Sequence, residues 1–176
     1  MVLLPLLSVV LIGWPFGYAS TPYQPAWAAE HPKRAAIMAL AGPVSNLLLV
    51  LVAVLAIRIG VWMAVFDNPT TVSFGQIVVA ANAGMWEGVA FVVSVFFSLN
   101  LLLAIFNLIP VPPLDGSGVI PLFLNSANTS RYQRFIWGTP MLSWMGILVA
   151  WQLFPSLFRP VWLFLVNWIL DGPGYG

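Results

Sequence analysis

A proline-rich break follows a long apolar run at residues 107–118, which read NLIPVPPLDGSG. Pro110, Pro112 and Pro113 remove backbone donors, so an α-helix cannot continue through this segment. An acid, Asp115, comes next, and the glycines on its C-terminal side permit a tight turn. We therefore expect an apolar helix that ends near residue 109, followed by a non-helical segment that presents Asp115.

The composition places this break in a membrane protein. Of the 176 residues, 61% are hydrophobic and only 6% are charged, whereas soluble domains carry about 25% charged residues. The net charge of +1 gives no basic field for nucleic acid. Cysteine is absent, which excludes disulfides and thiolate metal sites. The sequence therefore predicts an all-α, polytopic membrane helix bundle in contact with lipid, with Asp115 on its proline-broken segment.

The apolar segments predict the order of the membrane helices. A spanning helix needs roughly 20 apolar residues, and we expect three of them, at about 36–58, 88–109 and 135–154. We also expect a partial helix at 1–14, an interfacial helix near 74–86, and an interfacial or re-entrant segment at 157–170. Pro155 and Pro160 separate that last segment from the third span. No soluble domain is evident, so residues 1–176 are predicted to form a single membrane-embedded domain.

The cations agree with one orientation of these spans. Four lie on one side of the membrane (Lys33, Arg34, Arg131 and Arg134) and two on the other (Arg58 and Arg159). Because cytoplasmic loops carry an excess of Lys and Arg, the first side is predicted to be cytoplasmic. Asp115 then lies near the cytoplasmic side of the bundle.

Polar residues inside the apolar segments are the candidates for chemistry. Asn46 lies within the first span, and Asn100 and Asn107 lie seven residues apart on one helical face that leads to Asp115. A carboxylate at membrane depth costs roughly 2.5–3.5 kcal/mol, so it lines a polar cavity, pairs with a cation or binds a metal. Two alternatives stay open: Asp115 caps a short helix from residue 117 onward, and Asn46 bonds to a neighbouring helix.

Two motifs and one loop resemble those of the site-2 protease family of intramembrane zinc metalloproteases. NLIPVPPLDG resembles the family's N-x-x-P-x-P-P-L-D-G motif, and AGPVSN at residues 41–46 resembles its G-P-x-x-N segment. The loop FGYASTPYQP resembles that of compact bacterial members without a PDZ domain. The resemblance implies a multi-pass protein of the bacterial cytoplasmic membrane that cleaves membrane-spanning substrate helices.

The same resemblance implies roles for two residues. In the family, zinc is held by two histidines of an H-E-x-x-H helix and by the aspartate of the L-D-G motif, and the glutamate activates a zinc-bound water. Asp115 matches the third zinc ligand. Asn46 matches a residue that positions the substrate or stabilises the oxyanion.

The sequence departs from the family in one important respect, because H-E-x-x-H is absent from these 176 residues. The only histidine, His31, lies in a charged cluster before the first span, and we interpret it as a loop or interfacial residue. Glu87 stands alone at the entrance of the second span, and Ser117 and Gly118 replace the arginine or similar residue that follows L-D-G in the family. Catalytic zinc needs three protein ligands. We therefore expect this chain alone neither to bind zinc nor to hydrolyse peptides.

Three interpretations remain. In the first, the chain is a truncated or mis-started family member whose H-E-x-x-H half lies upstream. In the second, it is a non-catalytic relative that binds membrane helices without cutting them. In the third, it is a small membrane transport protein that uses Asp115 as a proton or cation site. None of them assigns an oligomeric state.

Overall fold

A computed structural model describes residues 25–139, 141–170 and 174–175 of the chain. It divides the chain into two compact units, residues 1–30 and 31–176, which we describe separately. In the first unit, a short helix, α2, covers Pro25–Glu30. The predicted partial helix at 1–14 and nearly all of the loop FGYASTPYQP lie outside the described residues. The single domain over residues 1–176 stays a prediction.

Three long helices form the second unit: α3 (Pro32–Trp62), α4 (Met85–Leu108) and α7 (Met141–Leu170). Each is long and apolar enough to cross a membrane. The shorter elements are β1 (Phe66–Asp67), β2 (Val79–Ala80), α5 (Asp115–Val119), a 3₁₀ turn η1 (Ile120–Leu122) and α6 (Ser126–Gly138). The predicted all-α fold of a multi-pass integral membrane protein is confirmed.

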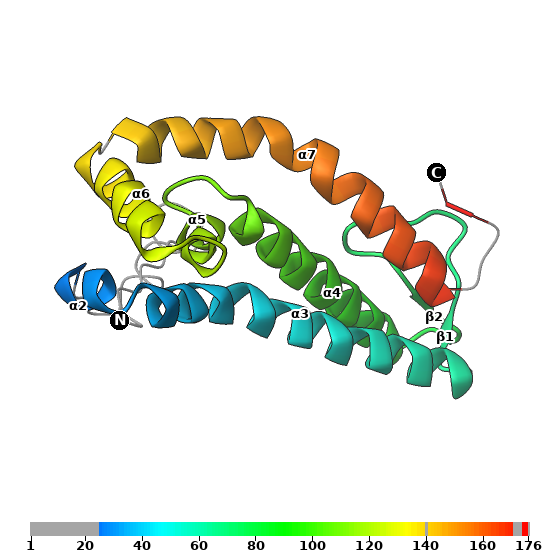
Figure 1. The fold of residues 1–176 in the computed structure, drawn as a ribbon. Coiled ribbons are helices and arrows are strands. Elements are labelled where there is room, and N and C mark those ends of the chain that lie inside the picture. The colour runs from blue at the N-terminus through cyan, green and yellow to red at the C-terminus, as the bar shows by residue number, and fades with distance from the viewer. Residues whose placement is uncertain (1–24, 140, 171–173, 176) are drawn as a thin grey trace, which may run out of the picture. The chain divides into compact units, whose positions relative to one another are not determined.

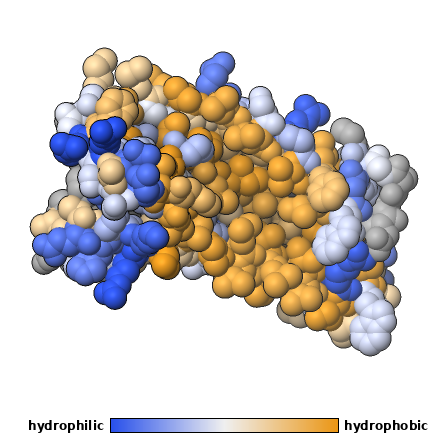
Figure 2. Space-filling view, viewed as in Figure 1, coloured by the Kyte–Doolittle hydropathy of each residue, from blue (hydrophilic) through white to orange (hydrophobic). Residues whose placement is uncertain are grey.

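The long helices alternate in direction, so the shorter elements that connect them lie at the two ends of this unit (Figure 1). One end holds the start of α3, the end of α4, the short helices α5 and α6, and the start of α7. The other end holds the antiparallel β1–β2 pair. Figure 2 shows a broad hydrophobic surface over the long helices between two more hydrophilic ends, as expected for a lipid-facing bundle.

The core lies between α3, α4 and the C-terminal half of α7. Its buried residues include Ile57, Phe97 and Val166. Two polar contacts fix α7 to the other helices: the indole Nε1 of Trp162 donates to Ser98 Oγ at 3.0 Å, and the Arg58 guanidinium donates to the carbonyl of Trp168 at 2.7 Å. The C-terminal half of α7 is therefore anchored to both α3 and α4.

The predicted boundaries of the third span were wrong. Instead of a span at 135–154 and a separate segment at 157–170, one helix runs through 141–170, with Pro155 and Pro160 inside it. Residues 135–138 belong to α6. A membrane helix tolerates internal proline because breaking the helix would expose still more backbone groups to lipid. The contacts of Trp162 and Trp168 hold the part of α7 beyond both prolines in place.

The interfacial helix expected near residues 74–86 was also wrong. This segment consists mainly of turns and bends around the two-residue strand β2, and the helix begins only at residue 85. The backbone amides of Ile77 and Val78 donate to the hydroxyl of Ser94, at 3.0 and 3.4 Å, and Ser94 is fully buried. Because this hydroxyl accepts amides that a helix would use internally, the segment packs against α4 in a non-helical conformation.

Candidate functional site

The proline motif breaks the chain between α4 and α5, as the sequence predicted. Helix α4 ends at Leu108, the Pro112–Pro113 peptide bond is cis, and α5 begins at Asp115. Local bonds hold the connection: the amide of Val111 donates to the carbonyl of Ile109 at 2.8 Å, and the amide of Leu114 donates to that of Val111 at 3.0 Å. The segment between the helices is non-helical, as expected, but Asp115 itself is the first residue of α5 and not part of that segment.

The carboxylate of Asp115 lies against α3, at the glycine of the second motif. A Cβ added to Gly42 would lie only 2.9 Å from Asp115 Oδ2, so the carboxylate occupies the space that a side chain would fill. Asn46 follows one helical turn later and is half-buried. Since residues four apart share a helical face, Asn46 lies on the face of α3 that the carboxylate contacts. The fold thus brings the two motifs together.

Close backbone contacts surround the rest of the motif. A Cβ on Gly116 would overlap the carbonyl groups of Leu108 and Ile109 at the end of α4. A Cβ on Gly146, in α7, would overlap the carbonyl oxygen of Pro112. Only hydrogen fits at both positions, so α4 and α7 contact the Asp115 segment directly through backbone atoms.

Helix α6 adds a hydrogen bond to the same segment. The hydroxyl of Tyr132 donates to the carbonyl oxygen of Ser117 at 2.8 Å, and the hydroxyl of Ser117 donates to the carbonyl of Leu114 at 2.8 Å. Sequence reasoning missed Tyr132 and Gly146, because no local pattern indicates which distant residue will contact a given turn. The pKa of the Tyr132 hydroxyl is raised because burial disfavours its charged form.

Asp115 occupies the first turn of α5, outside the three long helices. Burial raises the pKa of its carboxyl above the ordinary value. The capping alternative receives no support, since the N-cap position belongs to Leu114 and no side-chain bond caps this helix. The carboxylate is thus oriented toward α3 rather than toward the start of its own helix.

The two asparagines of the predicted α4 face lie in different surroundings. Asn100 is buried, and its side-chain nitrogen donates to the carbonyl of Phe96 in the same helix at 2.8 Å. Asn107 is half-buried in the last turn of α4. Asn100 therefore has a local role in its own helix, and Asn46 is the asparagine on the face that meets Asp115.

The candidate ligands other than Asp115 do not complete a zinc site among the described residues. His31 occupies the N-cap position of α3, and Glu87 lies in the first turn of α4, at the opposite end of that helix from Asp115. The described residues contain no group of three or more His, Cys, Asp or Glu side chains that could hold a metal ion. Catalytic zinc needs three protein ligands. The described part of the chain therefore offers Asp115 alone and does not fit zinc by itself.

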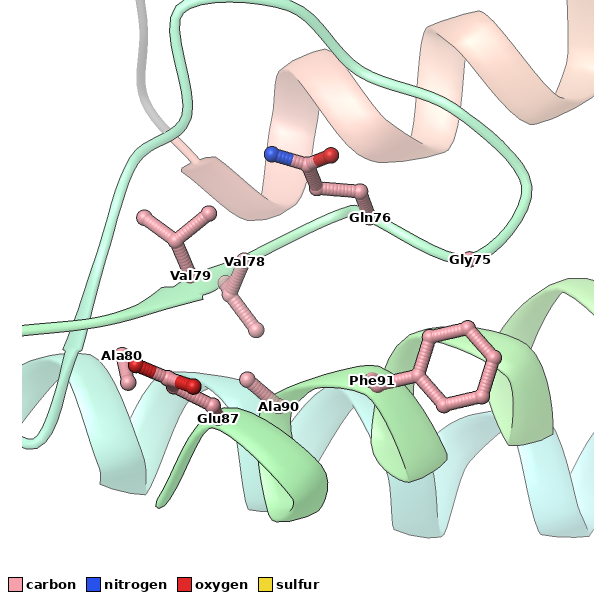
Figure 3. A pocket seen from close by; sticks show the side chains of 8 residues that line it. All are labelled: Gly75, Gln76, Val78, Val79, Ala80, Glu87, Ala90 and Phe91. Carbon is pink, nitrogen blue, oxygen red and sulfur yellow. The ribbon is translucent and has the colours of Figure 1, made fainter. Parts of the chain in front are cut away.

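A pocket of about 370 Å³ lies elsewhere, between residues 75–80 and the start of α4 (Figure 3). Glu87 and Gln76 supply its polar groups, and Val78, Ala90 and Phe91 are among its apolar walls. Because Glu87 begins α4 and Asp115 follows its end, the whole length of α4 separates this pocket from the Asp115 site.

Comparison with known proteins supports the motif-based resemblance. The family described as peptidase family M50 matches residues 8–147. The chain is 31% identical over 173 residues to "Putative zinc metalloprotease Rip2" of Mycolicibacterium smegmatis, covering 97% of this chain and 55% of that protein. It is 31% identical over 150 residues to "Putative zinc metalloprotease YwhC" of Bacillus subtilis, covering 75% of this chain and 62% of that protein.

The chain thus spans little more than half the length of these curated relatives. No solved structure matches it. The family match covers most of the chain, including both motifs that meet at Asp115. The chain therefore belongs to peptidase family M50, the site-2 protease family.

Proposed function

We propose that this chain forms the larger membrane-embedded part of an intramembrane zinc metallopeptidase that cleaves membrane-spanning substrates. In this proposal Asp115 is one of three zinc ligands, and the H-E-x-x-H histidines belong to a segment outside these 176 residues. Zinc would supply an activated water for peptide hydrolysis once its site is complete. The single observation that carries the proposal is the contact of the Asp115 carboxylate with Gly42, which joins the two family motifs.

The chain's own residues would position the substrate. Asn46 is half-buried, and its side-chain amide both donates and accepts hydrogen bonds. It lies one turn from the glycine against which the carboxylate rests. We propose that this amide binds a backbone group of the substrate, holding the peptide beside Asp115 in the cytoplasmic membrane of a bacterium.

The test uses the protein expressed from its complete reading frame. Translation of the DNA upstream of Met1 is expected to reveal H-E-x-x-H in frame. Zinc is then measured by mass spectrometry in the purified protein, together with cleavage of a model single-span substrate in detergent. We expect Asp115→Asn to lose both zinc and cleavage, whereas Asn46→Ala keeps zinc and loses cleavage.

Asp67→Asn is the matched control, because Asp67 is an exposed acid at the opposite end of the bundle. It should retain both zinc and cleavage. Stoichiometric zinc in the Asp115→Asn protein would refute the proposed ligand, and zinc bound by the 176 residues alone would refute the divided site.

The second candidate is a non-catalytic relative that binds membrane helices. One observation favours it: the 176 residues contain a single histidine, His31. This candidate predicts that no upstream H-E-x-x-H exists and that the protein retains single-span substrates without cutting them. Cleavage that depends on Asp115 would exclude it.

A further inference from the structure

We propose that the end of the bundle around α6 is a binding surface for anionic phospholipid headgroups. The proposed peptidase function assigns no role to this surface. The charge, the exposure and the position of α6 (Ser126–Gly138) indicate the lipid site.

The buried and exposed sides of α6 differ in composition. Thr129 and Gln133 are buried on the side that packs against the protein. Arg131, Arg134 and Phe135 are exposed, and their spacing of three and four residues places them on one stripe of the opposite side. The helix is therefore amphipathic, with its outward stripe combining two cations and a large aromatic ring.

The aromatic groups of this surface suit a lipid interface. The side chain of Phe135 is 59% exposed, and that of Phe123, just before α6, is 83% exposed. Exposing rings of this size to water costs free energy, whereas the boundary between headgroups and acyl chains accommodates them beside Lys and Arg. Since α7 begins three residues after α6 ends, connectivity also keeps α6 at the membrane surface.

Within the unit of residues 31–176, the exposed charge at this end is mainly positive. Lys33 and Arg34, both exposed, lie in the first turn of α3 at the same end of the unit. Among the described residues from 31 onward, the only acid at this end is Asp115, whose carboxylate rests against α3. Within the unit from residue 31 onward, no described acid is therefore placed to neutralise the two arginines of α6. The negative phosphate groups of anionic lipid complement the positive charge of this surface and accept the paired N–H groups of arginine.

Lipid bound here would also contact the helix that steadies the candidate site. The same helix donates the Tyr132 hydrogen bond to the carbonyl of Ser117, two residues beyond Asp115. A lipid that fixes α6 would therefore reduce the opening of α5. We expect slower amide hydrogen exchange in residues 114–119 when anionic lipid is present.

The test exploits the absence of cysteine from the sequence. A fluorophore is attached to Gly138→Cys, which lies seven residues after Arg131 on the same stripe and where an added Cβ meets nothing within 4 Å. The protein is reconstituted in phosphatidylcholine nanodiscs. Quenching is then measured with headgroup spin-labelled phosphatidylglycerol or phosphatidylcholine.

We expect phosphatidylglycerol to quench more strongly, with a preference that falls about fivefold for each arginine removed by Arg131→Gln or Arg134→Gln. Replacing both by Lys should retain most of the preference, because charge is kept. High salt should weaken it. In phosphatidylglycerol nanodiscs, exchange at residues 114–119 should become faster when both arginines are replaced by Gln.

Two controls are available in the same chain. A fluorophore at Gly88→Cys, another open and exposed position but at the opposite end of α4, should show no preference between the two lipids. Arg159→Gln removes an exposed cation from α7 and should leave the signal at position 138 unchanged. Equal quenching by both lipids in the parent protein would overturn the proposal, as would a preference that survives removal of both α6 arginines.

Discussion

The contact between Gly146 and the proline motif makes a quantitative prediction about stability. In Gly146→Ala, the new methyl group would overlap the carbonyl oxygen of Pro112. This oxygen is part of the backbone between two prolines, whose fixed φ angles leave it little room to rotate away. Either α7 or the motif must therefore move.

The magnitude follows from two opposing terms. Replacing glycine by alanine inside a helix gains about 1 kcal/mol of helix propensity. Overpacking a closely packed contact costs about 1–3 kcal/mol, and backbone contacts fall at the upper end because they relax least. We therefore expect Gly146→Ala to lower the free energy of unfolding by about 2 kcal/mol.

Gly88→Ala supplies the reference for the propensity term. Gly88 also lies within an apolar helix, but its added Cβ meets nothing within 4 Å. Its free energy of unfolding should rise by up to about 1 kcal/mol. Because the propensity gain is common to both variants, the difference between their free energies of unfolding isolates the cost of the overlap, at about 3 kcal/mol.

Reversible unfolding in mixed dodecylmaltoside and dodecyl sulfate micelles, followed by circular dichroism, measures both variants. Hydrogen exchange locates the change, which should appear at the amides of residues 114–117. If Gly146→Ala matched Gly88→Ala in stability and left exchange at the motif unchanged, α7 would not support the Asp115 segment, and the reasoning would fail.

Three further predictions concern single contacts in the bundle. Ser94→Ala leaves two buried amides without an acceptor and should cost about 1–3 kcal/mol of stability, with faster hydrogen exchange at Ile77. Trp162→Phe removes the buried indole–hydroxyl bond between α7 and α4 and should lower the free energy of unfolding by about 1 kcal/mol in the same micelle assay. Gly42→Ala should change stability little, because a side chain can swing aside, but it should displace the Asp115 carboxylate, and a changed rate of carbodiimide labelling would report this.

The sequence predicted the features that depend on local backbone chemistry. Three prolines within four residues exclude a helix, so the end of α4 near residue 109 followed directly, whereas the start of a new helix at Asp115 did not. The apolar composition likewise indicated that lipid surrounds most of the chain. In lipid the backbone must satisfy its own hydrogen bonds, which favours helices. Both conclusions needed only the residues in the segment concerned.

The errors arose where distant contacts outweighed local preference. Pro155 and Pro160 indicated a break, but the helix continues because lipid offers no partner for freed backbone groups. The composition of residues 74–84 was compatible with an interfacial helix. In the structure, however, two of their amides donate to the hydroxyl of Ser94, more than ten residues further along the chain. Neither outcome is visible in the segment itself.

In the candidate site, likewise, the motif residues could be predicted from the sequence and the residues that pack against them could not. Asp115 and Asn46 were found from motifs, whereas the residues that fix their geometry (Gly42, Tyr132 and Gly146) come from three different helices. Gly42 lies within a quoted motif, yet its role as the surface on which the carboxylate rests depends on how α5 packs against α3. Spacing along the chain carries no information about that packing.

The arrangement also indicates why the Asp115 segment is built from backbone contacts. A carboxylate that must meet a partner in one geometry benefits when it is held there beforehand, because less conformational freedom is lost when the partner arrives. Helix α3 limits the movement of the carboxylate at Gly42, and α7 limits the movement of the preceding turn at Gly146. Helix α6 holds the following residues through the hydrogen bond of Tyr132. A change at Gly146 or Tyr132 should therefore weaken whatever binds Asp115, although the contacts of both residues are with the backbone of neighbouring residues.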